Sequence, residues 1–313
     1  MKTMINKTHI EGLLYQHSLE MKESGPNSKN PGTQFITGTI EVATDAALTN
    51  IVPVHFTYVT AVTSTGKVNR AFSTLQNICD GVIPSVMKNG AENAATIKID
   101  SAIGLNEFFS NRDGKEELVS VKRNEGGFIT VGGPLEEKET ARNTFTTDIL
   151  ITNCTRKEAD DERKIPEKVI VKGAIFDFRG ALMPVEFSTT APAAMNYFEG
   201  LGASASEPVF TKVWGNQISE TIVRVYTEES AFGEDSVREV KSSRKDFVIT
   251  GASKEPYAWD SEDTITAVEL TQKMAERETY LATMKQRQDE YNATKNQPAP
   301  NAAPMSAIGG FNF

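Results

Sequence analysis

The stretch Gly38–Phe56, GTIEVATDAALTNIVPVHF, decides the fold because its pattern returns later in the same chain. The counterpart is Gly173–Phe187, GAIFDFRGALMPVEF. Both segments begin with glycine, a small residue and isoleucine, and both end with Pro-Val, one polar residue and Phe. The same pair of segments in the same order predicts a duplicated β-module.

Two further matches flank these segments in the same order. They are Lys29–Pro31 with Lys164–Pro166, and Val121-Lys122 followed by Phe128 with Val240-Lys241 followed by Phe247 at the same remove. Such agreement in register is hard to obtain by chance, so duplication is the working premise. Two similar β-modules in tandem suit a long ligand better than a small substrate.

The charge of the chain limits its functions. Its 313 residues include 33 Lys and Arg against 42 Asp and Glu, a formal charge of -9. This balance argues against coating duplex DNA through overall basicity, but it allows a local basic groove.

Only two cysteines occur, Cys79 and Cys154, which predicts no disulfide framework and a reducing compartment. No apolar run has the length of a signal peptide or membrane span, so we expect a soluble cytoplasmic protein, in the host cytoplasm if phage-encoded.

The first module predicts three strands, a short helix and two further strands. The expected ranges are Leu13–Met21, Gln34–Ala43, Ile51–Val62, Arg70–Asp80 for the helix, Ala95–Ile103 and Leu118–Val131. Gly81 follows the helix as a plausible stop.

The second module repeats this order. The expected strands are Phe145–Thr155, Lys168–Phe178, Leu182–Ser188, Pro208–Trp214, Thr221–Tyr226 and Val237–Ile249, with the helix at Ala193–Leu201 and a charged hairpin loop at Glu158–Pro166.

Three strands, a helix and two strands is the connectivity of the OB-fold. The chain resembles phage-type single-stranded DNA-binding proteins built from tandem OB-folds, in layout and in duplication. The resemblance implies a mainly β protein with two tandem OB-fold-like five-stranded barrels, each with a short helix, plus a C-terminal α-helix and a disordered tail. The implied divisions are a first barrel at 1–135, a second at 136–260, an amphipathic helix at 261–295 and a flexible tail at 296–313.

The region after the second module predicts one amphipathic helix over Thr264–Thr294. Two positions stay open for it: packing on the second barrel, or contact with a partner or sister subunit, which gives a homo-oligomer. The tail ends in Phe311 and Phe313, and it resembles the C-terminal tips through which single-stranded DNA-binding proteins recruit replication partners. It lacks their acidic run, so a recruiting peptide and an end without function both stay open.

Catalytic and metal-binding motifs are missing from the sequence. It has no P-loop, no His-Glu-x-x-His and no Cys-x-x-Cys. Its three histidines are scattered, and the carboxylates of Asp160–Glu162 are flanked by basic residues, which favours a solvated hairpin over a cation site. We expect no enzymatic activity and no cofactor.

Binding single strands requires cations for phosphates and aromatic faces for bases. The predicted strands and their loops supply both, and the nucleic-acid-binding candidates are Tyr58, Lys67, Arg70, Lys98, Lys122, Arg123, Lys172, Phe178, Arg179, Lys212, Trp214, Arg224, Lys241 and Arg244. Strand alternation places Lys212 and Trp214 on one face. Each lysine also has an interpretation as a solvated strand residue, and each aromatic as a core residue.

The sequence leaves two functions open, and they belong to different classes of protein. The first is a non-catalytic protein that coats exposed single-stranded DNA during replication or recombination and recruits other proteins through Phe311 and Phe313. The second is a structural or assembly protein, such as a virion component, because fold alone does not choose between them. RNA in place of DNA stays open, since no reader of the 2′-OH is identifiable.

Overall fold

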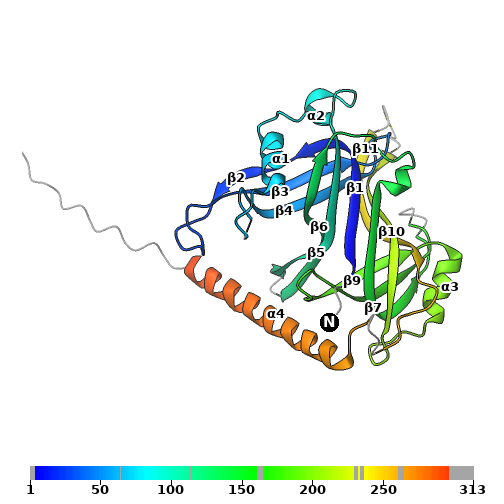
Figure 1. Cartoon of the computed structure of the whole chain (residues 1–313). Coiled ribbons are helices and arrows are strands. Elements are labelled where there is room, and N and C mark those ends of the chain that lie inside the picture. The colour runs from blue at the N-terminus through cyan, green and yellow to red at the C-terminus, as the bar shows by residue number, and fades with distance from the viewer. Residues whose placement is uncertain are drawn as a thin grey trace, which may run out of the picture.

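The computed structural model describes residues 4–63, 65–112, 115–160, 165–228, 232, 236–259 and 264–295. The side chains at 112, 221–228, 236–243, 294 and 295 are outside this description. The chain is mainly β, with few helices and one long helix after the last strand (Figure 1).

Five strands of the first half form a closed cycle of pairings. The elements are β1 (Asn6–His17), β2 (Glu20–Glu23), β3 (Gln34–Ala43), β4 (Ile51–Thr60), α1 (Arg70–Cys79), α2 (Val86–Asn89), β5 (Thr96–Arg112) and β6 (Lys115–Val131). Around the cycle, β1 pairs with β3, β3 with β4, β4 with β6, β6 with β5, and β5 with β1. Only the β4–β6 pairing is parallel. The short β2 pairs with the first residues of β3, on the edge whose last residues pair with β1.

The helix α1 closes one end of this cycle. Asn69 caps its first turn by accepting a hydrogen bond from the backbone N–H of Ala71. Phe72, Leu75 and Ile78 lie on one face and are buried in the core of the first half. The predicted helix is therefore present, one residue shorter than expected.

The second half repeats the cycle. Its elements are the 3-10 turn η1 (Glu139–Ala141), β7 (Asn143–Lys157), β8 (Lys168–Phe176), β9 (Leu182–Thr189), α3 (Pro192–Gly200), β10 (Val209–Glu228) and β11 (Ser236–Ala252). The pairings are β7 with β8, β8 with β9, β9 with β11, β11 with β10, and β10 with β7, and again only the third is parallel. Both halves therefore share one strand connectivity, as the duplicated pattern predicts.

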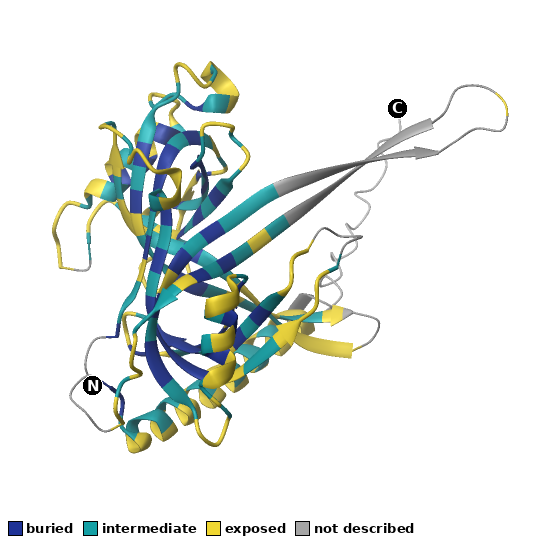
Figure 2. Cartoon of the chain, turned by 90° about the vertical axis from the view of Figure 1, so that its right-hand side faces the viewer, coloured by how far each residue is buried: buried dark blue, intermediate teal, exposed yellow. Residues whose placement is uncertain are grey.

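The halves are joined by their first strands. β1 pairs antiparallel with β7 from Asn6↔Thr147 to Ile10↔Asn143, which produces one eleven-stranded sheet. The core is shared as well, because Ile103 of β5 is buried among the side chains of the second half. Figure 2 shows buried residues along the strands of both halves and between them.

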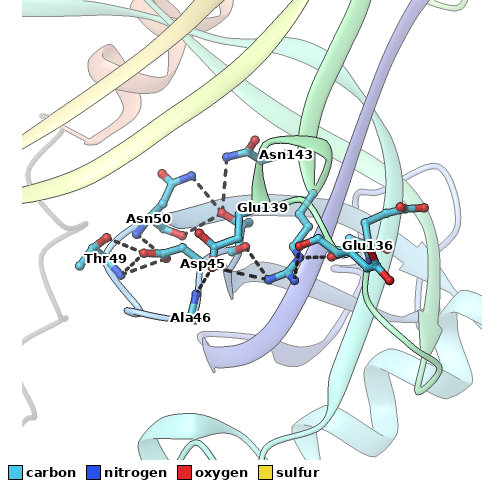
Figure 3. Close-up of polar contacts among 11 residues, drawn as sticks. Asp45, Ala46, Thr49, Asn50, Glu136, Glu139 and Asn143 are labelled. Carbon is cyan, nitrogen blue, oxygen red and sulfur yellow. Dashed lines mark hydrogen bonds and ion pairs between the residues drawn. The ribbon is translucent and has the colours of Figure 1, made fainter.

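Polar side chains reinforce this joint (Figure 3). Asn50 of the first half donates to the backbone carbonyl of Gln217 on β10 at 3.2 Å, and Asn143 of β7 donates to the hydroxyl of Thr44 in the first half at 3.4 Å. The backbone N–H of Ala46 donates to Glu139 at 2.7 Å. Buried polar groups are costly unless they are paired, so these bonds favour one relative placement of the halves.

The duplicated glycines have a steric reason. Gly38 on β3 and Gly173 on β8 both lie next to a shift in strand register. A Cβ at Gly38 would collide with the carbonyl oxygen of Ser18, and one at Gly173 with that of Leu150. In each half the strand crosses a neighbouring backbone too closely for a side chain.

The helix α4 (Ala267–Lys295) begins on the second half and then runs along the hairpin β5–β6 of the first (Figure 1). Just before it, Ile265 is buried with Phe176 and Phe210. Further along, Gln288 donates to the carbonyl of Phe109 at 2.6 Å and accepts from its N–H at 3.3 Å, as a neighbouring strand would. Packing on the second barrel alone was therefore too narrow an expectation.

Three boundary predictions were wrong. Pro208–Trp214 and Thr221–Tyr226 belong to the single strand β10, whose pairing with β11 continues through a bulge at Trp214 and Gly215. Ala95–Ile103 underestimates β5, which continues to Arg112. The strand predicted at Leu13–Met21 begins at Asn6, because its polar first residues pair with β7, and it ends at His17, so that Met21 lies in the separate strand β2.

Replacing Gly173 by alanine is expected to lower the free energy of unfolding by roughly 1–3 kcal/mol, because the added methyl forces β7 and β8 apart. Urea unfolding of both proteins measures the difference. The control is Gly200→Ala in α3, where an added Cβ meets nothing within 4 Å and no loss is expected. Equal stabilities of the two variants would contradict the steric explanation.

Candidate nucleic-acid interface

A cleft of about 650 Å³ lies between the hairpin β5–β6 and the outer faces of β8, β9 and β11. Among the described residues, its basic side chains are Lys122, Lys168, Lys172, Lys245 and Arg277, and its acidic side chains are Glu107, Glu186 and Asp246. The whole chain has more acidic than basic residues, so this excess of basic residues sets the cleft apart.

Alternation along β8 and β9 produces the floor of the cleft. Val169 and Val171 are buried, so Lys168, Ile170 and Lys172 lie on the outer face of β8. Lys172 is directly opposite Glu186 in the β8–β9 register. Period-two patterning therefore places the two lysines side by side along one strand.

Each carboxylate of the cleft already forms an ion pair with one basic side chain. The ion pairs are Lys168–Asp246 at 3.2 Å, Lys172–Glu186 at 2.7 Å and Arg277–Glu107 at 2.6 Å. Two lysines remain. Within the described part of the chain, neither Lys122 nor the exposed Lys245 makes an ion pair. They supply the uncompensated positive charge of the cleft.

Lys122 reaches from β6 of the first half into the second half. Its Nζ lies 4.8 Å from the ring centroid of Phe187 and 5.1 Å from that of Phe247, and it donates to the carbonyl of Glu186. Burial lowers the pKa of Lys122 to about 8, although Asp246 and Glu186 oppose the change. The ammonium therefore connects the two halves and is not free at the surface.

Lys98 and Arg123 are also held by neighbouring carboxylates. Lys98 pairs with the buried Glu11 at 2.8 Å, and Arg123 with Glu125 at 2.9 Å. Burial works to raise the pKa of Glu11, but the hydrogen bond and charge of Lys98 and the N–H of Glu136 hold that pKa below its usual value. Both basic residues therefore neutralise acidic neighbours on their own half.

The other candidates of the first half lie apart from the cleft. Tyr58 is 48% exposed, and its ring lies 4.5 Å from that of Phe35. Lys67 is exposed in the loop before α1, and Arg70 is exposed at the first residue of α1.

Aromatic candidates of the second half lie on two different surfaces. Phe178 is 84% exposed in the turn between β8 and β9, with the Arg179 guanidinium 5.0 Å from its ring centroid. Trp214 is 40% exposed on β10, and the fully buried Val213 separates it from the half-buried Lys212. Lys212 and Trp214 therefore share the outer face of β10, as alternation predicts, but neither lines the cleft.

Arg244 is half-buried on β11 and lies outside the cleft lining. The side chains of Arg224 and Lys241, and the whole of Phe311 and Phe313, lie outside the described residues, as do Asp161 and Glu162 of the charged loop. Of the candidates, Lys122 and Lys172 are brought together in the cleft.

Residues 5–286 of the chain match the YorF family. The chain belongs to the YorF family. No curated protein matches it. Among solved structures, the YorF-family chain is similar to a deletion mutant of the single-stranded DNA binding protein from Thermus aquaticus, with 11% sequence identity and a TM-score of 0.44, over 84% of this chain and 100% of that one.

Several cleft residues of this YorF-family protein were absent from the sequence candidates: Ser120, Thr152, Lys168, Ile170, Lys245 and Arg277. Lys168 and Lys172 are separated by an even number of positions on one strand, so their side chains lie on the same face. This spacing could have predicted Lys168 as a cleft residue. Arg277 had no such signal, because only the folded chain brings α4 to β5.

Two features are absent from the described part of the chain. It contains no group of three or more His, Cys, Asp or Glu that could hold a metal ion. None of the helices described has both the length and the apolar character needed to span a membrane. Cys79 and Cys154 are free.

The buried ammonium of Lys122 predicts a pH effect. Between about 8, its pKa in the fold, and its ordinary value of 10.5, the unfolded chain binds more protons than the folded chain. The free energy of unfolding therefore gains a contribution that rises with pH across this window, by at most ~1.4 kcal/mol per pH unit. Urea unfolding from about pH 7 to about pH 10 should show this rise for the native chain and not for Lys122→Met.

A Lys88→Met control, at an exposed lysine of α2, should follow the native curve. Parallel curves for the native chain and Lys122→Met would contradict the assignment.

Proposed function

We propose that this protein binds single-stranded DNA without catalysing a reaction, and that the phosphates of the strand follow the basic cleft. The excess of basic over acidic side chains in that cleft, in an acidic chain, is the observation that supports the proposal. Polyanion binding depends on such local positive potential rather than on net charge.

The form of the cleft also suits an unpaired strand. Its floor is an open strand surface where lysines alternate with Ile170, and Ser120 adds a hydroxyl donor. Phosphates accept hydrogen bonds from hydroxyl and ammonium groups, and apolar side chains contact sugars and base faces. Lys245 and Lys172 are the phosphate contacts of this proposal.

The strand connectivity supports a finer proposal, that each cycle is an OB-fold barrel. A helix follows the third strand, and the third and fifth strands pair in parallel to close each cycle. In OB-folds the second and third strands form the ligand face. Those strands of the second half are β8 and β9, which form the floor of the cleft.

The first half has its own corresponding face, on β3 and β4. There Phe35 and Tyr58 form a tilted aromatic pair at one end, and a hydrogen bond of 3.1 Å joins the His55 ring to the Thr39 hydroxyl. We assign this face a few nucleotides of the same strand, with Tyr58 as a stacking platform. The division into barrels at 1–135 and 136–260 belongs to this proposal.

The biological setting is part of the same proposal. A protein of this kind coats strands exposed during replication or recombination. Recruitment of other proteins by Phe311 and Phe313, and self-association through α4, stay predictions from the sequence.

Titration of a fluorescent oligo(dT) at several salt concentrations tests the function. We expect the logarithm of affinity to fall linearly with the logarithm of salt concentration, by about 0.7 for each phosphate neutralised. Lys245→Gln and Lys172→Gln should each weaken binding and reduce this slope by about one such contact.

Lys88→Gln is the matched control, because Lys88 is an exposed lysine outside the cleft and its loss removes the same charge. It should leave affinity and slope near those of the native chain. Absence of binding at low salt would remove the proposal and favour a structural or assembly role. Equal losses from all three variants would show that overall charge, not the cleft, holds the strand.

A further inference from the structure

A second cavity lies next to the basic cleft. It has a volume of about 340 Å³ and is enclosed by β5, the turn between β8 and β9, and α4. None of the roles assigned above uses it. Its position beside the cleft makes its chemistry relevant to any strand held there.

One ion pair separates the two spaces. Arg277 of α4 and Glu107 of β5 line both the cavity and the cleft, with Leu105 beside them. The Arg277 guanidinium contacts both carboxylate oxygens of Glu107, at 2.6 and 3.3 Å, and donates to the carbonyl of Leu182 at 3.2 Å. The two side chains are only 12% and 5% exposed. A group that passes from the cleft into the cavity therefore passes this pair.

The walls of the cavity suit a flat ring. Ile103, Leu105 and Met183 form an apolar floor, and the rings of Phe178 and Tyr280 lie at the rim. Phe178 is 84% exposed although it is large and apolar. An aromatic side chain in that position offers a face for stacking, which contributes ~1–3 kcal/mol for a nucleobase.

Two carboxylates of the walls each keep one acceptor oxygen without a hydrogen bond. Asp177 accepts from two backbone N–H groups through Oδ1, and Glu125 accepts from Thr57 and Arg123 through Oε1. Among the described residues, no hydrogen bond reaches Asp177 Oδ2 or Glu125 Oε2.

The basic groups of the cavity are already engaged. Lys273 pairs with Glu276 at 2.7 Å, and Arg277 is held by Glu107. The cavity therefore lacks a free cation for a phosphate, but it has carboxylate oxygens for a ligand that donates.

We propose that this cavity takes one nucleobase of a single strand and prefers bases that carry an exocyclic amino group. This inference rests on the proposed function, because the strand in the cleft delivers the base. Adenine, cytosine and guanine present an amino donor to a carboxylate acceptor, whereas thymine presents carbonyl oxygens on either side of one N–H. The ring lies against Phe178 and the amino edge faces Asp177 and Glu125.

Binding of oligo(dA), oligo(dC) and oligo(dT) of equal length, measured at one salt concentration, tests the preference. We expect oligo(dA) and oligo(dC) to bind roughly 2–10-fold more tightly than oligo(dT), the range for about one net hydrogen bond. Glu125→Gln, which replaces an acceptor oxygen by an amide donor, should reduce this ratio.

A variant that fills the cavity supplies an independent measurement. Ala181 lines the cavity, and Ala181→Leu should make the affinities for the three oligonucleotides equal, because it lowers those for oligo(dA) and oligo(dC) more than that for oligo(dT). Ala205→Leu is the matched control, at an exposed alanine in a groove elsewhere on the second half. Unfolding midpoints of both variants report whether each one is folded.

The outcomes separate the two proposals. If no oligonucleotide binds, the proposed function fails and the cavity assignment fails with it. If all three bind with one affinity, or oligo(dT) binds best, single-strand binding stands and the base pocket is wrong. If Ala181→Leu is folded and keeps the native preference, the preference comes from elsewhere and the cavity assignment is wrong.

Discussion

The pairing of β1 with β7 is the constraint on which the rest of the structure depends. It runs from Asn6 to Ile10 and turns two closed cycles into one continuous sheet. Without it each half would keep its own connectivity, but the hairpin β5–β6 would lose the backbone connection that helps to hold it over β8 and β9. The basic cleft belongs to neither half alone, because Lys122 comes from the first half, whereas Lys168 and Lys172 come from the second.

Lys122 is a charged side chain that is buried where the two halves meet. A lysine loses hydration when it is partly buried, and its pKa falls accordingly. The rings of Phe187 and Phe247 and the carbonyl of Glu186 replace part of that hydration. The ammonium is therefore stable enough to stay protonated near neutral pH, yet it is held away from solvent. Its place at the base of the cleft raises the local potential without making it a mobile surface contact.

Much of the fold was predictable from local pattern. The repeated glycines marked close crossings of strands, and the spacing of Phe72, Leu75 and Ile78 predicted α1. The residues between Trp214 and Thr221 were predicted to lie between two strands, whereas they continue β10 through a bulge at Trp214 and Gly215. The cleft was predictable only in part, because alternation places Lys172 on an outer face but does not indicate which element of the other half lies above it.

The attachments of α4 explain why so polar a helix has a fixed position. Its apolar stripe is thin, and Met274 and Tyr280 are 53% and 55% exposed, so packing alone holds it weakly. Side-chain contacts with the hairpin β5–β6 hold it instead. Arg277 forms an ion pair with Glu107 and Lys285 forms one with Glu116, and Gln288 donates a hydrogen bond to the carbonyl of Phe109. Its start is anchored in the second half near Ile265. The helix therefore spans from one half to the other, and together with the β1–β7 pairing it supports the hairpin from both sides. The position of the hairpin is consequently set by two separate connections, one of backbone hydrogen bonds and one of side-chain contacts. In the second connection, salt weakens the more exposed Lys285–Glu116 pair more than the buried Arg277–Glu107 pair.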